Sequence, residues 1–248
     1  MTKPERKDIH NSDVPVLCRS CEVRHRGICG ALDPEQLAYL ATHSTRRARA
    51  SSQELIAAGQ EQARYANLMR GVVKLTKLMA DGRQQIVGLQ FAPDFLGSPF
   101  TDQTDVTAET ATDVELCTFP RAVLEEIMHL SPQLEHRVHQ QAHRELDEAR
   151  DWLLTLGRKS AAEKVASFLY LIATHIDPAH HDRRQNVEFE LPLRRSEIAD
   201  FLGLTTETVS RRLTKLRKSG VIGIENARHV TVPDIDRLRL ECEQDRST

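Results

Sequence analysis

The sequence predicts an α+β chain with an N-terminal antiparallel β-roll, a long helix after it, and a C-terminal winged helix-turn-helix. Three patterns predict this order: short alternating apolar runs between residues 46 and 119, a heptad-like stripe within 131–156, and a helix–turn–helix pattern at 196–219. The expected segments are a cysteine-bearing stretch over residues 1–30, the β-roll over 31–130, the long helix over 131–158 and the helix-turn-helix domain over 159–248.

Composition excludes several classes of protein. The 248 residues carry 34 Lys and Arg against 36 Asp and Glu, a net charge of −2, so any contact with nucleic acid would need a local basic patch. Residues 1–13 are polar and lack the apolar core of a signal peptide, and we expect them to be disordered. No apolar run approaches the ~18 residues of a membrane span, so we expect a soluble, cytoplasmic chain without a membrane partner or disulfides.

The N-terminal half begins with a short predicted helix over residues 34–43, opened by Asp33-Pro34. Strands are expected over residues 46–119, and the clearest two flank Asp81-Gly82. Because Gly82 can adopt a positive φ, this dipeptide between apolar runs predicts a β-hairpin. The whole region therefore predicts a small antiparallel barrel or roll.

After residue 120 the pattern becomes helical. The expected helices are residues 121–129, 131–156 and 160–176, and a polar loop over 177–186 follows them. Ser131-Pro132 is a favourable start for the long helix, and Gly157 should end it. Its apolar stripe consists of Ala142, Leu146, Ala149, Leu153 and Leu156. The stripe could pack on its own domain, but it is narrow and flanked by charges, so we favour the seam of a homodimer.

Residues 196–219, SEIADFLGLTTETVSRRLTKLRKS, have the pattern of two helices joined by a tight turn. Ser196 should cap the first helix, Gly203 should supply a positive φ in the turn, and Thr205 should cap the second helix. Two further apolar runs flank a short turn and predict a β-hairpin wing; they are Val221–Ile224 and His229–Val232.

The second of these helices carries groups suited to double-stranded DNA. Bases would be read by Glu207, Ser210 and Arg211, and the DNA backbone would be contacted by Thr206, Arg212, Lys215 and Lys218. Between Leu191 and Val221, seven Lys or Arg and three acids give a local charge of +4, against −2 for the whole chain. The alternative is a helical hairpin that binds no DNA, which the basic bias and the wing disfavour.

Three of the five cysteines follow the pattern C-x2-C-x7-C, at Cys18, Cys21 and Cys29. Clustered cysteines in a reducing cytosol indicate a metal site. Cys117, at the end of a predicted strand, is the best fourth ligand for a [4Fe–4S] cluster, and Cys242 remains a spare. Zinc with His25 as fourth ligand explains the spacing about as well, and a site without metal is a weaker alternative. Arg19, Arg24, His25 and Arg26 should favour deprotonated thiols.

The chain resembles the CRP/FNR family of bacterial regulators, and its FNR branch in particular. The resemblance lies in these cysteines, the Asp81-Gly82 hairpin, QIVGLQFAPDFLG (85–97), GRKSAAEKVASFL (157–169) and LGLTTETVSRRLTKL (202–216). It implies a cyclic-nucleotide-binding-like β-roll and a [4Fe–4S] cluster on the four cysteines. It also implies a homodimer that binds a palindrome like TTGAT-N4-ATCAA and controls anaerobic-growth genes, with activity lost when oxygen degrades the cluster. Contact with RNA polymerase, through the Asp81–Arg83 turn, is a further implication.

Several features set limits on this resemblance. No Lys or Arg occurs between Gln84 and Pro120, so a cyclic nucleotide's phosphate would lack a cation and we expect no cyclic-nucleotide control. Pro93 stands where Gly is usual in the FNR branch, and Ala149 stands where the enteric FNR has an acid, which should strengthen dimerisation. The alternative function is a zinc-stabilised, oxygen-insensitive regulator of the same fold. Enzymatic motifs are missing, so we do not expect an enzyme.

Overall fold

The computed structural model describes residues 14–19, 21, 23–101, 103–177 and 184–243. The residues expected to be disordered, 1–13, and most of the predicted polar loop over 177–186 lie outside these ranges. None of the described helices is long and apolar enough to cross a membrane.

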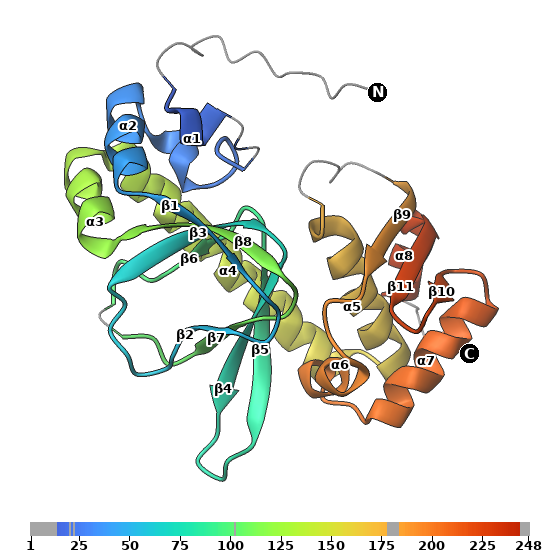
Figure 1. Ribbon diagram of the computed structural model, residues 1–248. Helices are drawn as coiled ribbons and strands as arrows, with labels where there is room; N and C mark the ends of the chain where they lie inside the picture. Colours follow the sequence, from blue (N-terminus) through green and yellow to red (C-terminus); the bar gives the residue numbers. More distant parts are fainter. Residues whose placement is uncertain (1–13, 20, 22, 102, 178–183, 244–248) are drawn as a thin grey trace.

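The β-rich half comprises two four-stranded antiparallel sheets, with strand orders β1-β8-β3-β6 and β2-β7-β4-β5 (Figure 1). The strands are β1 (Thr45–Arg49), β2 (Glu54–Ile56), β3 (Arg64–Arg70), β4 (Val72–Leu78), β5 (Gln84–Phe91), β6 (Phe95–Leu96), β7 (Thr107–Thr110) and β8 (Val114–Pro120). β4 and β5 form the predicted hairpin, and Gly82 in its turn has φ +83°. The antiparallel roll expected from the sequence is therefore confirmed.

Helices flank the roll and follow it. They are α1 (Val16–Arg19), the 3-10 helix η1 (Ile28–Ala31), α2 (Pro34–Thr42), α3 (Arg121–Leu130), α4 (Pro132–Arg158) and α5 (Ala161–His175). Local capping explains where they begin: Asp33 accepts from the Gln36 N–H at α2, and Ser131 accepts from the Leu134 N–H at α4. These starts were predicted correctly. The expected stop at Gly157 is wrong, because α4 continues to Arg158 and the backbone becomes extended at Lys159.

The long helix α4 joins the two halves of the molecule. Figure 1 shows it running behind the roll toward the C-terminal domain. Its 27 residues correspond to about 40 Å of helix. Near its start Leu134 and Val138 are buried with α3 and the roll, and near its end the rings of Trp152 and Phe201 lie 4.6 Å apart.

The C-terminal domain consists of α5, three further helices and a small antiparallel sheet of order β10-β11-β9. The elements are β9 (Gln185–Glu190), α6 (Arg195–Leu202), α7 (Thr206–Lys218), β10 (Gly223–Glu225), β11 (His229–Asp234) and α8 (Ile235–Glu241). β10 and β11 confirm the predicted wing, while β9 was not foreseen. Gly203 has φ +61° and ends α6 as expected. The helix begins two residues earlier than predicted, because Arg194 rather than Ser196 occupies the cap.

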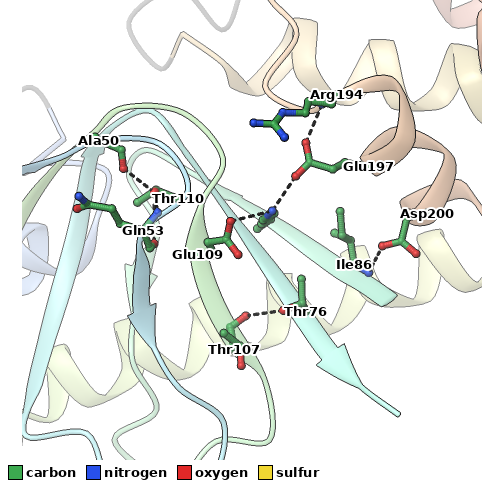
Figure 2. A network of polar contacts seen from close by, with 11 residues as sticks. Ala50, Gln53, Thr76, Ile86, Thr107, Glu109, Thr110, Arg194, Glu197 and Asp200 are labelled. Atoms are coloured by element: carbon green, nitrogen blue, oxygen red, sulfur yellow. Dashed lines mark hydrogen bonds and ion pairs between the residues drawn. The ribbon is translucent and has the colours of Figure 1, made fainter. Parts of the chain in front are cut away.

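A polar network joins the roll to the C-terminal domain. Lys74 on β4 pairs with Glu109 on β7 and with Glu197 on α6, and the backbone N–H of Ile86 donates to Asp200 (Figure 2). Since α6 is the first helix of the helix-turn-helix, this network holds that motif against the β4–β5 hairpin.

Candidate functional site

Helix α7 presents the residues expected to read DNA bases. Thr205 caps it by accepting from the Thr208 N–H, and its apolar side is buried through Val209, Leu213 and Leu216. That burial leaves Glu207, Ser210 and Arg211 exposed on the other side. The Ser210 hydroxyl donates to the Thr206 carbonyl at 2.9 Å, so it keeps only acceptor capacity for a base edge.

The residues expected to contact the DNA backbone fall into two groups. Thr206, Lys215 and Lys218 are exposed on α7. Arg212 is only partly exposed, and its Nε is buried without a hydrogen-bond partner among the described residues. The stem of Arg212 is therefore part of the domain's packing.

Arginines fix the wing beside α7. The turn between β10 and β11 has positive φ at Asn226 and Ala227. Arg195 donates to the Ala227 carbonyl at 2.8 Å, and Arg228 donates to the Leu191 carbonyl at 2.9 Å. Strand β9 completes the sheet by pairing with β11. These contacts hold the wing in place beside the exposed helix.

The four cysteines predicted as ligands line one cavity. Its lining consists of Leu17, Cys18, Cys21, Val23, Arg24, Gly27, Cys29, Arg46, Asn67, Met69, Pro93 and Cys117. The structure thus brings Cys117 of β8 to the N-terminal cysteines, although 88 positions separate it from Cys29 (117 − 29). Cys242 lies elsewhere, buried in the core of the C-terminal domain.

The floor of the cavity is a row of side chains across three strands. Cys117 on β8 lies directly opposite Arg46 on β1 and Asn67 on β3. Residues paired across antiparallel strands point to the same face, so all three reach the cavity. The Asn67 amide donates to Cys29 Sγ at 3.3 Å, and the Arg46 guanidinium donates to the Leu17 carbonyl at 2.6 Å. Both residues therefore tie the cysteine-bearing segment to the sheet.

The two ends of the cysteine-bearing segment are held very differently. Cys29 is in η1 beside Ile28, which is 1% exposed in the roll's core. A Cβ at Gly30 would lie 2.8 Å from the His25 carbonyl oxygen, so the backbone at residue 30 can approach the backbone at residue 25 this closely only with glycine. Cys18, by contrast, is in α1, a four-residue helix without buried residues. Cys29 and Cys117 are thus held by elements that pack into the roll, while Cys18 lies in a short helix that is not anchored in the core.

Burial governs the ionisation of these thiols. It raises the pKa of Cys18 to about 11, with further contributions from Cys117 and Cys21, and it raises the pKa values of Cys29 and Cys117 as well. Arg46 acts in the opposite direction on the pKa values of Cys18 and Cys117. The expectation that nearby arginines favour thiolates is therefore wrong for the protein without metal, because burial outweighs the charge of Arg46, the arginine that acts on Cys18 and Cys117.

The donor set fits an iron–sulfur cluster better than a zinc ion. Among the described residues, no three His, Cys, Asp or Glu form a group that could hold one metal ion. His25, the alternative zinc ligand, is exposed and does not line the cavity. Four thiols with a hydrogen-bond donor match the ligation of a [4Fe–4S] cluster, whose ligands are spread over four irons. The cavity measures only about 20 Å³, room for one water, so its lining would have to open to hold a cluster.

A second cavity of about 190 Å³ lies between the roll and α4. Its polar lining includes Gln62, Gln90, Gln141 and Glu145, and Lys and Arg are missing from its lining residues. Burial raises the pKa of Glu145, against a hydrogen bond from Gln141. None of the lining residues therefore offers an anion a positively charged group.

The apolar stripe of α4 is open in the single chain. Leu146 is 44% exposed and Leu153 is 71% exposed, Ala142 and Ala149 are also exposed, and Leu156 is partly buried. Within the described residues most of this stripe is therefore uncovered, as a seam between two copies would require.

Sequence reasoning missed Arg46 and Asn67 of the cysteine cavity and Lys74 of the domain interface. One signal was present: Asn67 and Lys74 are polar residues within otherwise apolar strand sequences, YANLM and VVKLT. A polar side chain at a core-facing strand position usually has a specific partner.

Two family models match the chain: a cyclic nucleotide-binding domain over residues 46–131 and a Crp-like helix-turn-helix domain over residues 163–241. A probable transcriptional activator from Rhizobium leguminosarum bv. viciae is 55% identical over 233 residues, which are 94% of this chain and 96% of the relative. The transcriptional activator protein FnrL of Cereibacter sphaeroides is 41% identical over 238 residues, with 94% and 96% covered. The structure of FixK2 from Bradyrhizobium japonicum, 30% identical, superposes with a TM-score of 0.69 and covers 82% of this chain and 98% of that one.

These relatives are transcriptional regulators rather than enzymes, as expected for this chain. They align over nearly its full length, through both the roll and the helix-turn-helix. The chain therefore belongs to the CRP/FNR family of transcription regulators, with a Crp-like helix-turn-helix as its DNA-binding element.

Proposed function

We propose that the chain is an oxygen-responsive transcriptional activator in which Cys18, Cys21, Cys29 and Cys117 hold a [4Fe–4S] cluster. The observation that carries this proposal is that four thiols from two distant segments line one cavity, whereas the fifth, Cys242, is buried in another domain. Four thiolates are the ligand set of such a cluster. When bound, the cluster would supply a centre that oxygen oxidises and degrades.

The four cysteines and Arg46 would have different roles in holding the cluster. Cys29 and Cys117 belong to elements that pack into the roll, so they would receive the cluster without moving far. Cys18 and Cys21 would close over it from the exposed side. Arg46 would offset part of the negative charge of the thiolates, because it already acts on two of them.

The cysteine-bearing segment also touches the helix expected to dimerise. Arg137 of α4 donates to the Arg26 carbonyl at 2.8 Å and to the His25 carbonyl at 3.5 Å. Ordering of this segment would therefore bias the position of α4. We propose that the cluster-bearing form is a homodimer along the α4 stripe, and that loss of the cluster weakens it.

A two-fold dimer would present two α7 helices to successive turns of the major groove, which are about 34 Å apart. A palindrome like TTGAT-N4-ATCAA suits this symmetry, and in each half-site the bases would be read by Glu207, Ser210 and Arg211. Through such sites the dimer would control anaerobic-growth genes. The Asp81–Arg83 turn, held by a 2.8 Å ion pair, is the proposed contact for RNA polymerase.

We also propose that the chain does not respond to cyclic nucleotides, even though a family model for that domain matches. The cavity between the roll and α4 has no cation in its lining and contains Glu145. A phosphate there would be buried beside an acid without a positive partner, which is unfavourable.

The test is iron and acid-labile sulfide per chain on anaerobically purified protein, with DNA binding measured before and after air is admitted. We expect about four of each, a broad visible absorbance that bleaches in air, and parallel loss of binding to the palindrome. Zinc without sulfide, or DNA binding unchanged after bleaching, would contradict the proposal.

A further inference from the structure

Asn67 links the two cysteines that the fold holds in place. Its amide nitrogen lies 3.3 Å from Cys29 Sγ, and its backbone pairs directly with Cys117. The residue is 5% exposed and lies on β3, an inner strand of its sheet. Cys29 and Cys117 come from different parts of the chain, so a residue that contacts both sets their relative position.

Only one of the two polar groups of the Asn67 side-chain amide has a hydrogen-bond partner among the described residues. Its Oδ1 is buried and accepts no hydrogen bond from the described residues. An apolar side chain of similar size would avoid this unfavourable burial. The stability of the roll therefore does not explain an asparagine here, whereas its one hydrogen bond, to a cysteine sulfur, does.

A metal-bound cysteine is a thiolate, which only accepts hydrogen bonds. The NH2 group of Asn67 is the half of the amide that can serve it, and that half already faces Cys29. A hydrogen bond to a ligand sulfur withdraws electron density from it and changes the stability and potential of the cluster.

We infer that Asn67 is a positioning residue for the cluster, donating a hydrogen bond to the Cys29 thiolate and thereby slowing loss of the cluster. This inference rests on the proposed function, because it requires that the four cysteines hold a cluster. Asn67 makes this contact at the expense of the roll's own stability. Its removal should therefore move the stability of the metal-free protein and that of the cluster in opposite directions.

The test compares the parent with Asn67→Leu and Asn67→Asp, as full-length proteins. Leu removes the donor and fills the space, while Asp keeps the shape and, when ionised, presents only acceptors. Three quantities are measured without oxygen: the urea midpoint of the metal-free protein, the rate of iron release to a chelator, and the Fe–S stretching frequencies by resonance Raman. Thr76→Val is the matched control, because Thr76 is a buried polar strand residue in the other sheet.

We expect iron release to be faster by about 10-fold in both variants, with shifted Fe–S frequencies. Metal-free Asn67→Leu should be at least as stable as the parent, and the control should release iron at the parent's rate. Release rates within twofold of the parent, or a lower urea midpoint that accounts for faster release, would overturn the role of Asn67 alone. A parent without iron and sulfide would overturn the cluster itself and this inference with it.

Discussion

Lys74 of β4 and Glu197 of α6 form a 2.7 Å ion pair across the interface between the roll and the helix-turn-helix domain. Lys74 is 6% exposed and also lies 3.0 Å from Glu109. Burial alone would lower its pKa, but the two carboxylates raise it above the usual value. A buried ammonium between two acids thus holds α6, the first helix of the helix-turn-helix, to a defined place on the roll.

Lys74→Met should therefore destabilise the chain by about 2 kcal/mol, because Glu109 and Glu197 lose their shared partner while remaining partly buried. Urea unfolding of the purified protein measures this. Lys77→Met is the control: Lys77 pairs with Asp105 on the surface, and its loss should change stability by less than about 0.5 kcal/mol. If the two substitutions lowered the free energy of unfolding equally, the buried pair at the interface would stabilise the chain no more than a surface pair.

Asp94 should make stability depend on pH near neutrality. Burial raises its pKa from 3.8 to about 7, against a hydrogen bond from the Phe91 N–H and with Glu148 and Glu145 nearby. Because this folded-state pKa lies above the unfolded value, the stabilising contribution is fully present at low pH and is lost as pH rises through 7. Between pH 5.5 and pH 8 the parent should lose about 2 kcal/mol relative to Asp94→Asn.

Urea unfolding at several pH values gives this difference directly. Asp105→Asn serves as the comparison, since Lys77 lowers the pKa of Asp105 and its carboxylate stays ionised throughout the window. A parent and an Asp94→Asn variant with parallel pH profiles would show that Asp94 is ionised in the folded protein at every pH tested.

Serine substitutions should show that four of the five cysteines are needed to hold iron and that the fifth is not. Cys29→Ser and Cys117→Ser should reduce iron from about four per chain to nearly none, because both residues line the cavity and belong to elements that pack into the roll. Cys242→Ser should keep full iron content, because Cys242 lies in the other core. Iron and sulfide assays on anaerobic protein decide the point, and a Cys117→Ser protein with full iron would remove Cys117 from the ligand set.

Arg211→Ala should weaken binding to the palindrome by about 10- to 100-fold and should relax discrimination against altered half-sites. Lys218→Ala, at the end of the same exposed helix, should weaken binding to all sequences and reduce the salt dependence by about one phosphate contact. Fluorescence anisotropy with matched and scrambled duplexes at several salt concentrations distinguishes them. If both substitutions lower affinity for both duplexes equally, Arg211 does not read a base.

Leu153→Glu should shift the chain toward monomer by at least 10-fold in its dissociation constant, because Leu153 lies on the stripe and is 71% exposed in the single chain. Leu154→Glu is the matched control, since Leu154 is 58% exposed but lies outside the stripe. Sedimentation velocity of the anaerobic protein reports the oligomeric state. A dimer disrupted by Leu154→Glu and not by Leu153→Glu would place the seam on another face of α4.

Local sequence signals predicted most elements of the fold. Asp33, Ser131 and Thr205 were recognised as caps because capping depends on groups within three residues, and Gly82 and Gly203 were recognised because they take positive φ. The cap at Arg194 was missed because its residue type is unusual there; the backbone N–H is satisfied instead by Glu197 at 2.8 Å.

Tertiary features were only partly accessible. Cys117 could be named from the small number of cysteines, but its neighbours Arg46 and Asn67 depend on how β1 and β3 pair with β8, and no local pattern gives that register. Lys74 and Glu197 are 123 positions apart, and no local pattern pairs them. Such contacts arise only when the two halves pack together.

Helix α4 touches the cysteine-bearing segment through Arg137 and touches α6 through Trp152. These two residues are 15 positions apart, or about 22 Å along a single helix. The helix therefore fixes both the distance and the relative rotation between the cysteine-bearing segment and the helix-turn-helix. One residue inserted between these contacts would lengthen the helix by only about 1.5 Å but would rotate one contact relative to the other by about 100°.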